Sequence, residues 1–165
     1  MKIPMALSAL AMGFALPALA APQVSSVRVS IGPDLAKQTQ TLDAREFDYL
    51  TRELKRSVEK RLDRSGALDP AGGELELIIE DARPNRPTFR EMAAKPGLSY
   101  QSFGVGGARI SGEYRAPTGA RTPVDYSWYE TDIRWAQYGS TWSDADEAFD
   151  RLAERLVKDG FKAND

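Results

Sequence analysis

The sequence predicts an α+β domain, a two-layer sandwich in which two amphipathic helices cover one face of a mixed, about four-stranded sheet. Two segments, near residues 43–65 and 143–160, place apolar side chains at helical spacing, and other segments alternate polar and apolar residues as half-buried strands do. The predicted order is β-α-β-β-β-α. Packing both helices on one face of the sheet is the simplest way to bury all of these apolar faces.

The first half of the domain contains a strand, the longer helix and a second strand. The first strand is predicted over residues 27–31 and the second over residues 75–80, both from alternating hydrophobicity. Between them, Asp43 can cap a helix, and Glu46 stands where a capping box needs an acid. Gly66 is a natural stop for this helix. Its apolar positions fall on one face: Phe47, Leu50, Leu54, Val58 and Leu62.

The second half is predicted as a hairpin followed by the last helix. Strands are expected over residues 103–116 and 124–135, joined by a turn at a Pro-Thr-Gly sequence. The last helix is expected to open at Ser143, with Asp146 at the capping-box position. Gly160 fits a left-handed stop at its end.

The N-terminus has the features of a cleavable secretory signal peptide over residues 1–20. Lys2 precedes an apolar run, and Ala18-Leu19-Ala20 supplies the small residues that signal peptidase reads, so cleavage is expected between Ala20 and Ala21. The run is shorter than the about 20 residues of a membrane anchor. Residues 21–165 are therefore expected to form a single exported domain, soluble in the periplasm or outside the cell, with no integral membrane segment after cleavage.

Several chemistries are excluded by composition. The chain has no Cys, hence no disulfide, thiol chemistry or lipid anchor on cysteine, and no His, the commonest general base and metal ligand. The net charge of −2, with both signs interspersed, argues against nucleic acid or an anionic membrane surface as the main partner. Gly104–Gly107 lacks the context of a nucleotide-binding loop. No cofactor and no metal are expected.

An unusual concentration of aromatic residues lies between residues 126 and 142. In a regular strand Tyr126 and Trp128 point to one face, and Tyr129 and Trp135 to the other. One pair is expected beneath the helices. The other is then expected on the open sheet face, where aromatics with polar tips often mark binding surfaces. The alternative is that all of them pack in the core.

The connection over about residues 82–102 is long and punctuated by prolines. Thr88 with Glu91 predicts one short helical turn within it. Arg86 and Arg90 contribute to a local excess of positive charge. A connection of this length is usually a functional loop or a disordered one. The candidate ligand-binding or partner-binding residues are therefore Tyr129, Trp135, Arg86 and Arg90.

A set of short motifs also occurs in order along residues 74–156. They are Arg83-Pro84-Asn85-Arg86-Pro87, Phe103-Gly104-Val105-Gly106-Gly107-Ala108, Glu113-Tyr114, Trp142-Ser143-Asp144-Ala145, and Phe149 with Leu152-Ala153. This set resembles bacterial exported proteins built around a domain of unknown function. Many members of that family look like lipoproteins with a cysteine at the cleavage site, where this chain has Ala20-Ala21. The resemblance implies an envelope location and no established catalytic residues.

The sequence thus favours a non-catalytic binding or accessory module of the cell envelope, with an envelope protein or a glycan as partner. The competing class is an enzyme, a carboxylate-based glycan hydrolase that uses an acidic pair such as Glu130 and Asp132, since paired carboxylates need neither His nor Cys. A third possibility is a subunit whose open sheet edge pairs with another chain.

Overall fold

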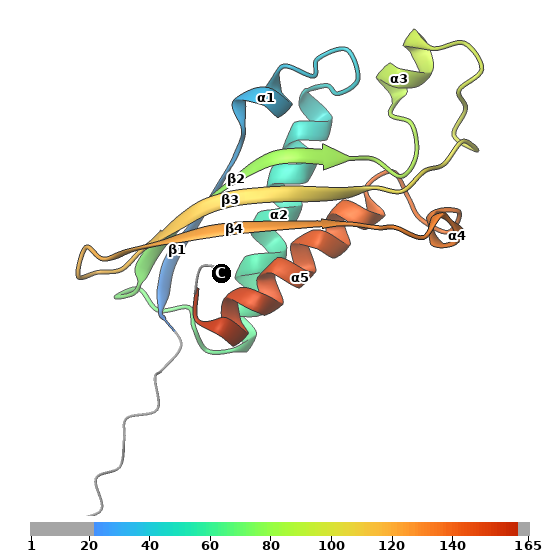
Figure 1. The fold of residues 1–165 in the computed structure, drawn as a ribbon. Coiled ribbons are helices and arrows are strands. Elements are labelled where there is room, and N and C mark those ends of the chain that lie inside the picture. The colour runs from blue at the N-terminus through green and yellow to red at the C-terminus, as the bar shows by residue number, and fades with distance from the viewer. Residues whose placement is uncertain (1–21, 162–165) are drawn as a thin grey trace, which may run out of the picture.

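The computed structural model describes residues 22–161 and has the predicted two-layer α+β architecture (Figure 1). The signal peptide and its cleavage site lie outside the described residues. The elements, in chain order, are β1 (Val24–Ile31), α1 (Pro33–Ala36), α2 (Ala44–Arg64), β2 (Gly73–Arg83), α3 (Phe89–Ala94), β3 (Gly107–Arg115), β4 (Arg121–Tyr129), α4 (Ile133–Ala136) and α5 (Ser143–Asp159).

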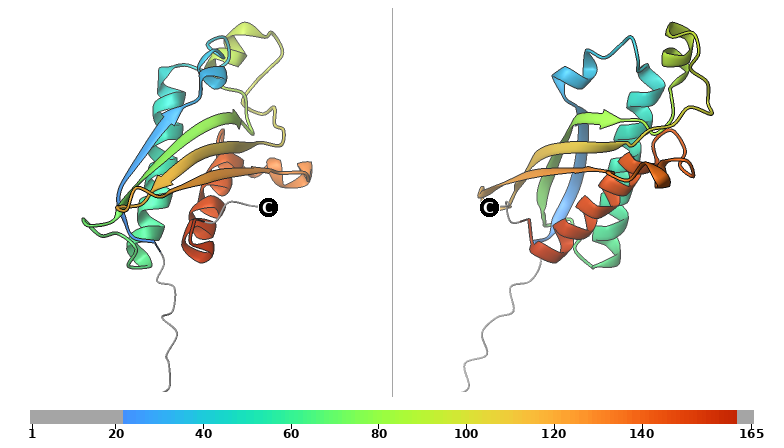
Figure 2. Two further views of the ribbon diagram at one scale, coloured as in Figure 1. Left: turned by 60° about the vertical axis from the view of Figure 1, so that its left-hand side comes forward. Right: turned by 45° about the vertical axis from the view of Figure 1, so that its right-hand side comes forward.

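The four strands form one mixed sheet in the order β1-β2-β3-β4. β1 and β2 are parallel and are connected through α2, whereas β2–β3 and β3–β4 are antiparallel. The two long helices, α2 and α5, lie side by side across one face of the sheet (Figures 1 and 2). The core lies between the two layers and is built from their facing side chains, among them Leu50, Leu54, Leu77, Ile110, Phe149 and Leu152.

The N-terminus of α2 follows the sequence prediction in part. The carboxylate of Asp43 accepts the backbone N–H groups of Arg45 and Glu46 at 2.9 and 3.3 Å, which confirms the predicted cap. Glu46 does not complete the capping box. Its carboxylate accepts the indole N–H of the buried Trp142 at 2.6 Å instead, because the tertiary fold brings α5 beside α2.

Of the two capping predictions for α5, the one for its N-terminus is wrong and the one for its C-terminus is confirmed. The helix begins at Ser143 as predicted, but Trp142 occupies the cap position and its side chain accepts no backbone N–H of the first turn. The predicted capping box at Asp146 is therefore wrong; its carboxylate bonds the Tyr49 hydroxyl on α2. At the other end Gly160 has the expected left-handed conformation, with φ 64°. The next side chain, Phe161, stacks on Tyr114 with ring centroids 4.6 Å apart.

The hairpin strands are shorter than the sequence predicts. β3 begins at Gly107 rather than at residue 103, because the N–H of Gly104 bonds the Asn85 carbonyl outside the sheet. Gly107 has φ 147°, and a Cβ there would lie 2.3 Å from the carbonyl oxygen of Trp128. β4 ends at Tyr129 rather than at residue 135, since Asp132 accepts the N–H of Arg134 and starts the short helix α4.

Within residues 22–161, no helix is long and apolar enough to cross a membrane.

Candidate binding site

Two connections meet at one end of the sandwich, away from the end at which β1 begins (Figures 1 and 2). They are residues 84–106, which contain α3, and residues 130–142, which contain α4. We call these two connections the loop end. They touch because side chains of the first connection bond the backbone of the second. The first connection is also tied to the segment before α2, since the Thr88 hydroxyl and the Arg90 guanidinium donate to the carbonyls of Thr41 and Thr39.

Arg86 joins the two connections directly. Its guanidinium donates to the carbonyl oxygens of Gln137 and Gly139 at 2.7 Å each, and to that of Tyr100 at 2.8 Å. The same guanidinium lies over the Tyr100 ring, 5.3 Å from its centroid. Arg86 therefore braces the loop end, and its positive charge is met there by neutral carbonyl groups.

Asn85 forms a second junction between the connections, and it is only 1% exposed. Its amide donates to a carboxylate oxygen of Asp144 at 2.5 Å, and its carbonyl oxygen accepts the Asp144 N–H at 2.8 Å. The same carboxylate oxygen accepts the Gly106 N–H at 2.7 Å. The Asn85 N–H also bonds the Thr141 carbonyl at 2.7 Å. Three of the motifs behind the family resemblance thus meet at one buried point.

Exposed apolar side chains gather on the loop end. The structure describes eight large hydrophobic side chains that are exposed, and all but Leu68 belong to these two connections. The most exposed are Tyr138 at 80%, Phe89 at 72% and Trp135 at 66%. The other four are Tyr100, Phe103, Val105 and Ile133. Such a concentration is uncommon on a protein that does not bind something there.

The loop end also carries positive charge without acidic partners. Residues 84–106 and 130–142 contain four basic and three acidic residues. Arg134 pairs with Asp132 at 2.6 Å. Among the described residues, no carboxylate lies within ion-pair distance of Arg86, Arg90 or Lys95. The Arg86 guanidinium is used by backbone carbonyl groups, whereas the charges of the exposed Arg90 and Lys95 are left to interact with solvent or with a ligand.

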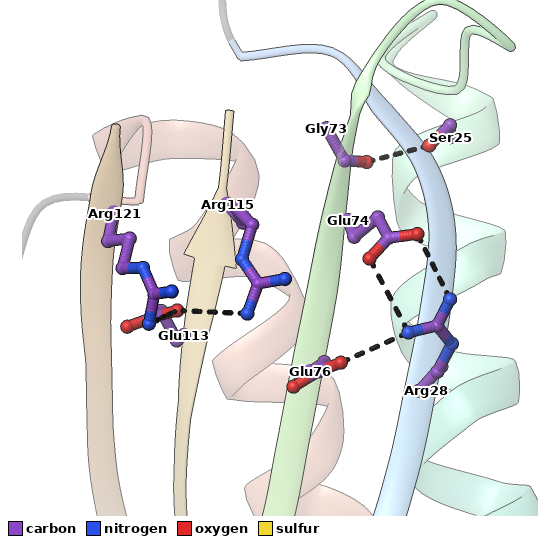
Figure 3. A network of polar contacts seen from close by, with 8 residues as sticks. All are labelled: Ser25, Arg28, Gly73, Glu74, Glu76, Glu113, Arg115 and Arg121. Atoms are coloured by element: carbon purple, nitrogen blue, oxygen red, sulfur yellow. Dashed lines mark hydrogen bonds and ion pairs between the residues drawn. The ribbon is translucent and has the colours of Figure 1, made fainter. Parts of the chain in front are cut away.

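The open face of the sheet is different, because its charges neutralise one another. Figure 3 shows Arg28 bridging Glu74 and Glu76 at 3.0 Å each, and Glu113 between Arg121 and Arg115 at 3.4 and 3.8 Å. A shallow depression of about 880 Å³ crosses all four strands on this face. Five of its lining residues, Arg28, Glu76, Glu113, Arg115 and Arg121, belong to these ion pairs, so the depression offers a ligand little uncompensated charge.

Tyr129 lies on the open face, at the last position of β4. Its hydroxyl donates to Asp81 at 2.6 Å, and the Arg83 guanidinium lies 4.7 Å from its ring centroid. Burial, and then the hydrogen bond to Asp81, raise the pKa of the Tyr129 hydroxyl. Tyr126 and Trp128 lie on the helix side, with arginines of α5 over their rings. The polar tip of Tyr129 is thus already used within the fold.

The sequence expectation that Trp135 shares the sheet face with Tyr129 is wrong. The chain leaves the sheet after Tyr129 and turns into α4, which places Trp135 on the loop end. Arg86 and Arg90 belong to the loop end as well. Sequence reasoning missed the exposed Phe89 and Tyr138, and it missed the junction at Asn85. Phe89 could have been found from the sequence, because a large apolar residue without helical or strand spacing in a proline-rich connection indicates exposure.

The acids proposed for catalysis have local structural roles. Glu130 accepts the N–H groups of Thr131 and Asp132 at 2.7 and 2.9 Å. Hydrogen bonds from the side chain and then from the backbone N–H of Arg134 hold the pKa of Asp132 below its usual value. In the part of the chain that the structure describes, no group of three or more acidic side chains is placed to hold a metal ion.

Asp146 is the carboxylate most perturbed by its surroundings. It lies between α2 and α5, where it accepts the Tyr49 hydroxyl at 2.8 Å through one oxygen. Among the described residues its other oxygen is buried and has no hydrogen-bond partner. Burial raises the pKa of Asp146 to about 6, and the nearby charges of Glu53 and Asp150 act in the same direction. The charged form is therefore disfavoured in the folded state.

Replacing Asp146 with asparagine is expected to stabilise the protein near neutral pH. The pKa of Asp146 is raised from 3.8 to about 6 in the folded state, so the protonated carboxyl favours folding. This contribution to the free energy of unfolding is complete below pH 3.8 and is lost as the pH rises from 3.8 through 6. Asp146→Asn removes that loss and should add about 1 kcal/mol at pH 7, after discounting for solvent screening. Urea unfolding at pH 4 and pH 7 measures the difference. Asp63→Asn on the exposed side of α2 is the matched control, and an equal gain at both pH values would contradict the prediction.

Fold and site together define a two-layer α+β domain that carries its exposed apolar side chains on two braced connections at one end. No family model matches the chain, and no curated protein matches it. The resemblance to a family of unknown function therefore stays a resemblance.

Two solved structures show a distant overall similarity. A minor lipoprotein from Acinetobacter baumannii aligns with a TM-score of 0.36 and 11% identity, over 84% of this chain and 92% of that one. The rare lipoprotein B from Shewanella oneidensis aligns with a TM-score of 0.38 and 11% identity, over 82% of this chain and 92% of that one. Both are bacterial lipoproteins by name. Similarity at this level carries no inference about the fold or the function of this chain.

Proposed function

We propose that this chain is an exported, non-catalytic binding module of the bacterial cell envelope and that it binds its partner through the loop end. The observation that carries the proposal is the concentration of exposed hydrophobic side chains there, seven of the eight on the described surface. The leader at residues 1–20 supports export, and the resemblance of the motifs supports an envelope location.

The loop end suits binding because it is braced as well as apolar. Three hydrogen bonds join the two connections directly, from the Arg86 guanidinium to Gln137 and Gly139 and from the Asn85 N–H to Thr141. Two more tie the Asn85 side chain to Asp144 at the start of α5. Less conformational entropy is lost on binding when a surface is already ordered. The open sheet face lacks such apolar exposure, and its charges are satisfied internally.

The outer edge of β4 is a weaker candidate for contact with another chain. Pro123 lies in the middle of this strand and cannot donate to a neighbouring strand. Arg121 and Asp125 add exposed charges along it. Proline and charge are common features of edge strands that resist pairing with a further strand.

Removing the two large aromatic side chains of α4 and the residues just after it is expected to weaken envelope binding. In the double variant Trp135→Ala, Tyr138→Ala, retention of the purified exported protein on an envelope fraction should fall at least about tenfold, as for loss of binding hot spots. Thermal unfolding should stay within about 2 °C of wild type, because exposed substitutions change stability little. Quantitative sedimentation with the envelope fraction measures the retention.

Leu68→Ala is the matched control for this experiment. Leu68 is an exposed apolar residue next to β1, at the other end of the molecule, and its truncation should leave retention unchanged. Equal retention of the wild type and the double variant on the envelope fraction would contradict the proposal. Release of reducing sugar from purified peptidoglycan, abolished by Glu130→Gln, would favour the hydrolase instead.

A further inference from the structure

We infer that the loop end docks onto the surface of a lipid bilayer that carries anionic headgroups. The inference rests on the proposed function and names the occupant of the same site. It is carried by three features of the described residues: the kind of apolar side chains that are exposed, the sign of the charge beside them, and the shape of this end of the molecule.

The exposed side chains are those that favour the boundary between water and lipid. Trp135, Tyr100 and Tyr138 combine a large apolar ring with a polar tip, and Trp and Tyr are enriched at membrane interfaces for that reason. Phe89 and Ile133 are wholly apolar and are also exposed. Inserted at the level of the headgroups, these side chains lose contact with water while the polar tips stay hydrated.

The charge beside these side chains is positive and uncompensated. Arg90 follows the exposed Phe89 on α3, Lys95 comes just after that helix, and the Arg86 guanidinium packs on the Tyr100 ring. Basic residues close to an anionic surface strengthen binding through attraction to the headgroups. The whole chain has a net charge of −2, so the remainder of the molecule is more acidic than the loop end. Such a separation of charge orients the molecule with its loop end toward a negative surface.

The shape favours a flat surface over a ligand that needs a groove. α3 and α4 project from the end of the sandwich (Figure 2). Depressions lie on the open sheet face, between α2 and α5, beside β1 and along β4, and none of these is lined by a residue of α3 or α4. Apolar and basic side chains on projecting segments can contact a bilayer surface without a groove. A glycan chain or a peptide would instead be expected to lie in a groove lined by these aromatics.

The overall composition led to the opposite expectation, that an anionic membrane surface is not the main partner. That expectation depended on both signs of charge being interspersed along the sequence. In the folded chain many acids are paired within the sheet face or used in caps, whereas Arg86, Arg90 and Lys95 are not paired. The distribution of free charge, rather than the net charge, supports the inference.

Vesicles test the inference directly. The exported protein should co-sediment with vesicles of phosphatidylcholine that contain phosphatidylglycerol, at least about tenfold more strongly than with phosphatidylcholine alone, and binding should weaken as salt is raised. Trp135 is the exposed one of the three tryptophans, since Trp142 is buried and Trp128 is half-buried, so its emission should shift to shorter wavelength on binding. Trp135→Phe should abolish the shift and keep most of the binding.

Charge reversal separates the loop end from general electrostatic attraction. Arg90→Glu with Lys95→Glu should weaken binding to the anionic vesicles at least about tenfold. Lys60→Glu with Arg64→Glu, the same change of charge on the exposed side of α2, should weaken it less than about threefold. Equal losses in the two variants would overturn the inference, because the attraction would then depend on net charge alone.

The vesicle and envelope experiments together distinguish a failure of this inference from a failure of the proposed function. Loss of envelope retention in Trp135→Ala, Tyr138→Ala together with no vesicle binding by the wild type would mean that the loop end holds a protein or a glycan. That result overturns the bilayer as occupant and keeps the binding module. If neither vesicle binding nor envelope retention responds to the loop-end variants, both proposals are wrong.

Discussion

Replacing Asn85 with alanine is expected to lower the free energy of unfolding by about 3 kcal/mol, because a buried donor and acceptor are removed together. Asn85 is 1% exposed, and its side chain meets both the N–H and the carboxylate of Asp144. In the variant the Asp144 N–H, at the start of α5, loses its acceptor, and the space of the amide is left empty. Urea unfolding measures the change, as a shift of the midpoint with an unchanged m-value.

Two further substitutions make this prediction specific to the junction. Asp144→Asn keeps an oxygen that can accept the Gly106 N–H and should cost less than half as much as Asp144→Ala, which keeps none. Gln101→Ala, an exposed amide in the same connection, should change stability by less than about 0.5 kcal/mol. If Asn85→Ala unfolds at the same urea concentration as Gln101→Ala, the buried junction does not stabilise the fold.

Replacing Arg86 with alanine is expected to release the residues around α4 and to cost about 2 kcal/mol. The guanidinium makes three hydrogen bonds to carbonyl oxygens of Tyr100, Gln137 and Gly139, and bonds from charged donors are stronger than neutral ones. Limited proteolysis should cut within residues 130–142 faster in the variant than in the wild type, since the braced backbone becomes accessible. Thermal unfolding gives the accompanying loss of stability.

The geometry of arginine makes a conservative replacement informative. Lysine has a single ammonium group and cannot meet three separated carbonyl groups with a planar fork, so Arg86→Lys should recover less than half of the lost stability. Arg90→Ala, whose side chain bonds one carbonyl on the surface, should leave proteolysis of residues 130–142 unchanged. Equal cleavage in Arg86→Ala and Arg90→Ala would show that Arg86 does not brace α4.

Local patterns predicted most of the secondary structure. Asp43 caps α2, Thr88 and Glu91 form a full capping box at α3, and Gly160 ends α5 in the left-handed conformation. Each of these depends on residues within about four positions, which is the range over which helix and cap signals act. The alternating strands and the amphipathic faces of α2 and α5 were predicted for the same reason.

Two errors occur where a distant residue replaced a local partner, and a third where a local cap was missed. Glu46 bonds Trp142 rather than its own helix start, and Asp146 bonds Tyr49 rather than capping α5. The strand predicted to Trp135 ends at Tyr129 because Asp132 caps a new turn. For Glu46 and Asp146, a hydrogen bond that exists only in the folded chain replaced the predicted local one. For Asp132, the cap lies within a run of aromatic residues that resembles a strand.

The sequence by itself determined the α+β class, the two amphipathic helices with most of their ends, and the expectation of an exported chain without cysteine or histidine chemistry. Only the tertiary structure decided where the exposed aromatics gather. Arg86 and Gly139 are 53 positions apart and Asn85 and Asp144 are 59 apart, yet hydrogen bonds between them assemble the loop end. Periodicity acts over a few residues, whereas a surface made of two connections depends on how the whole sheet brings their ends together.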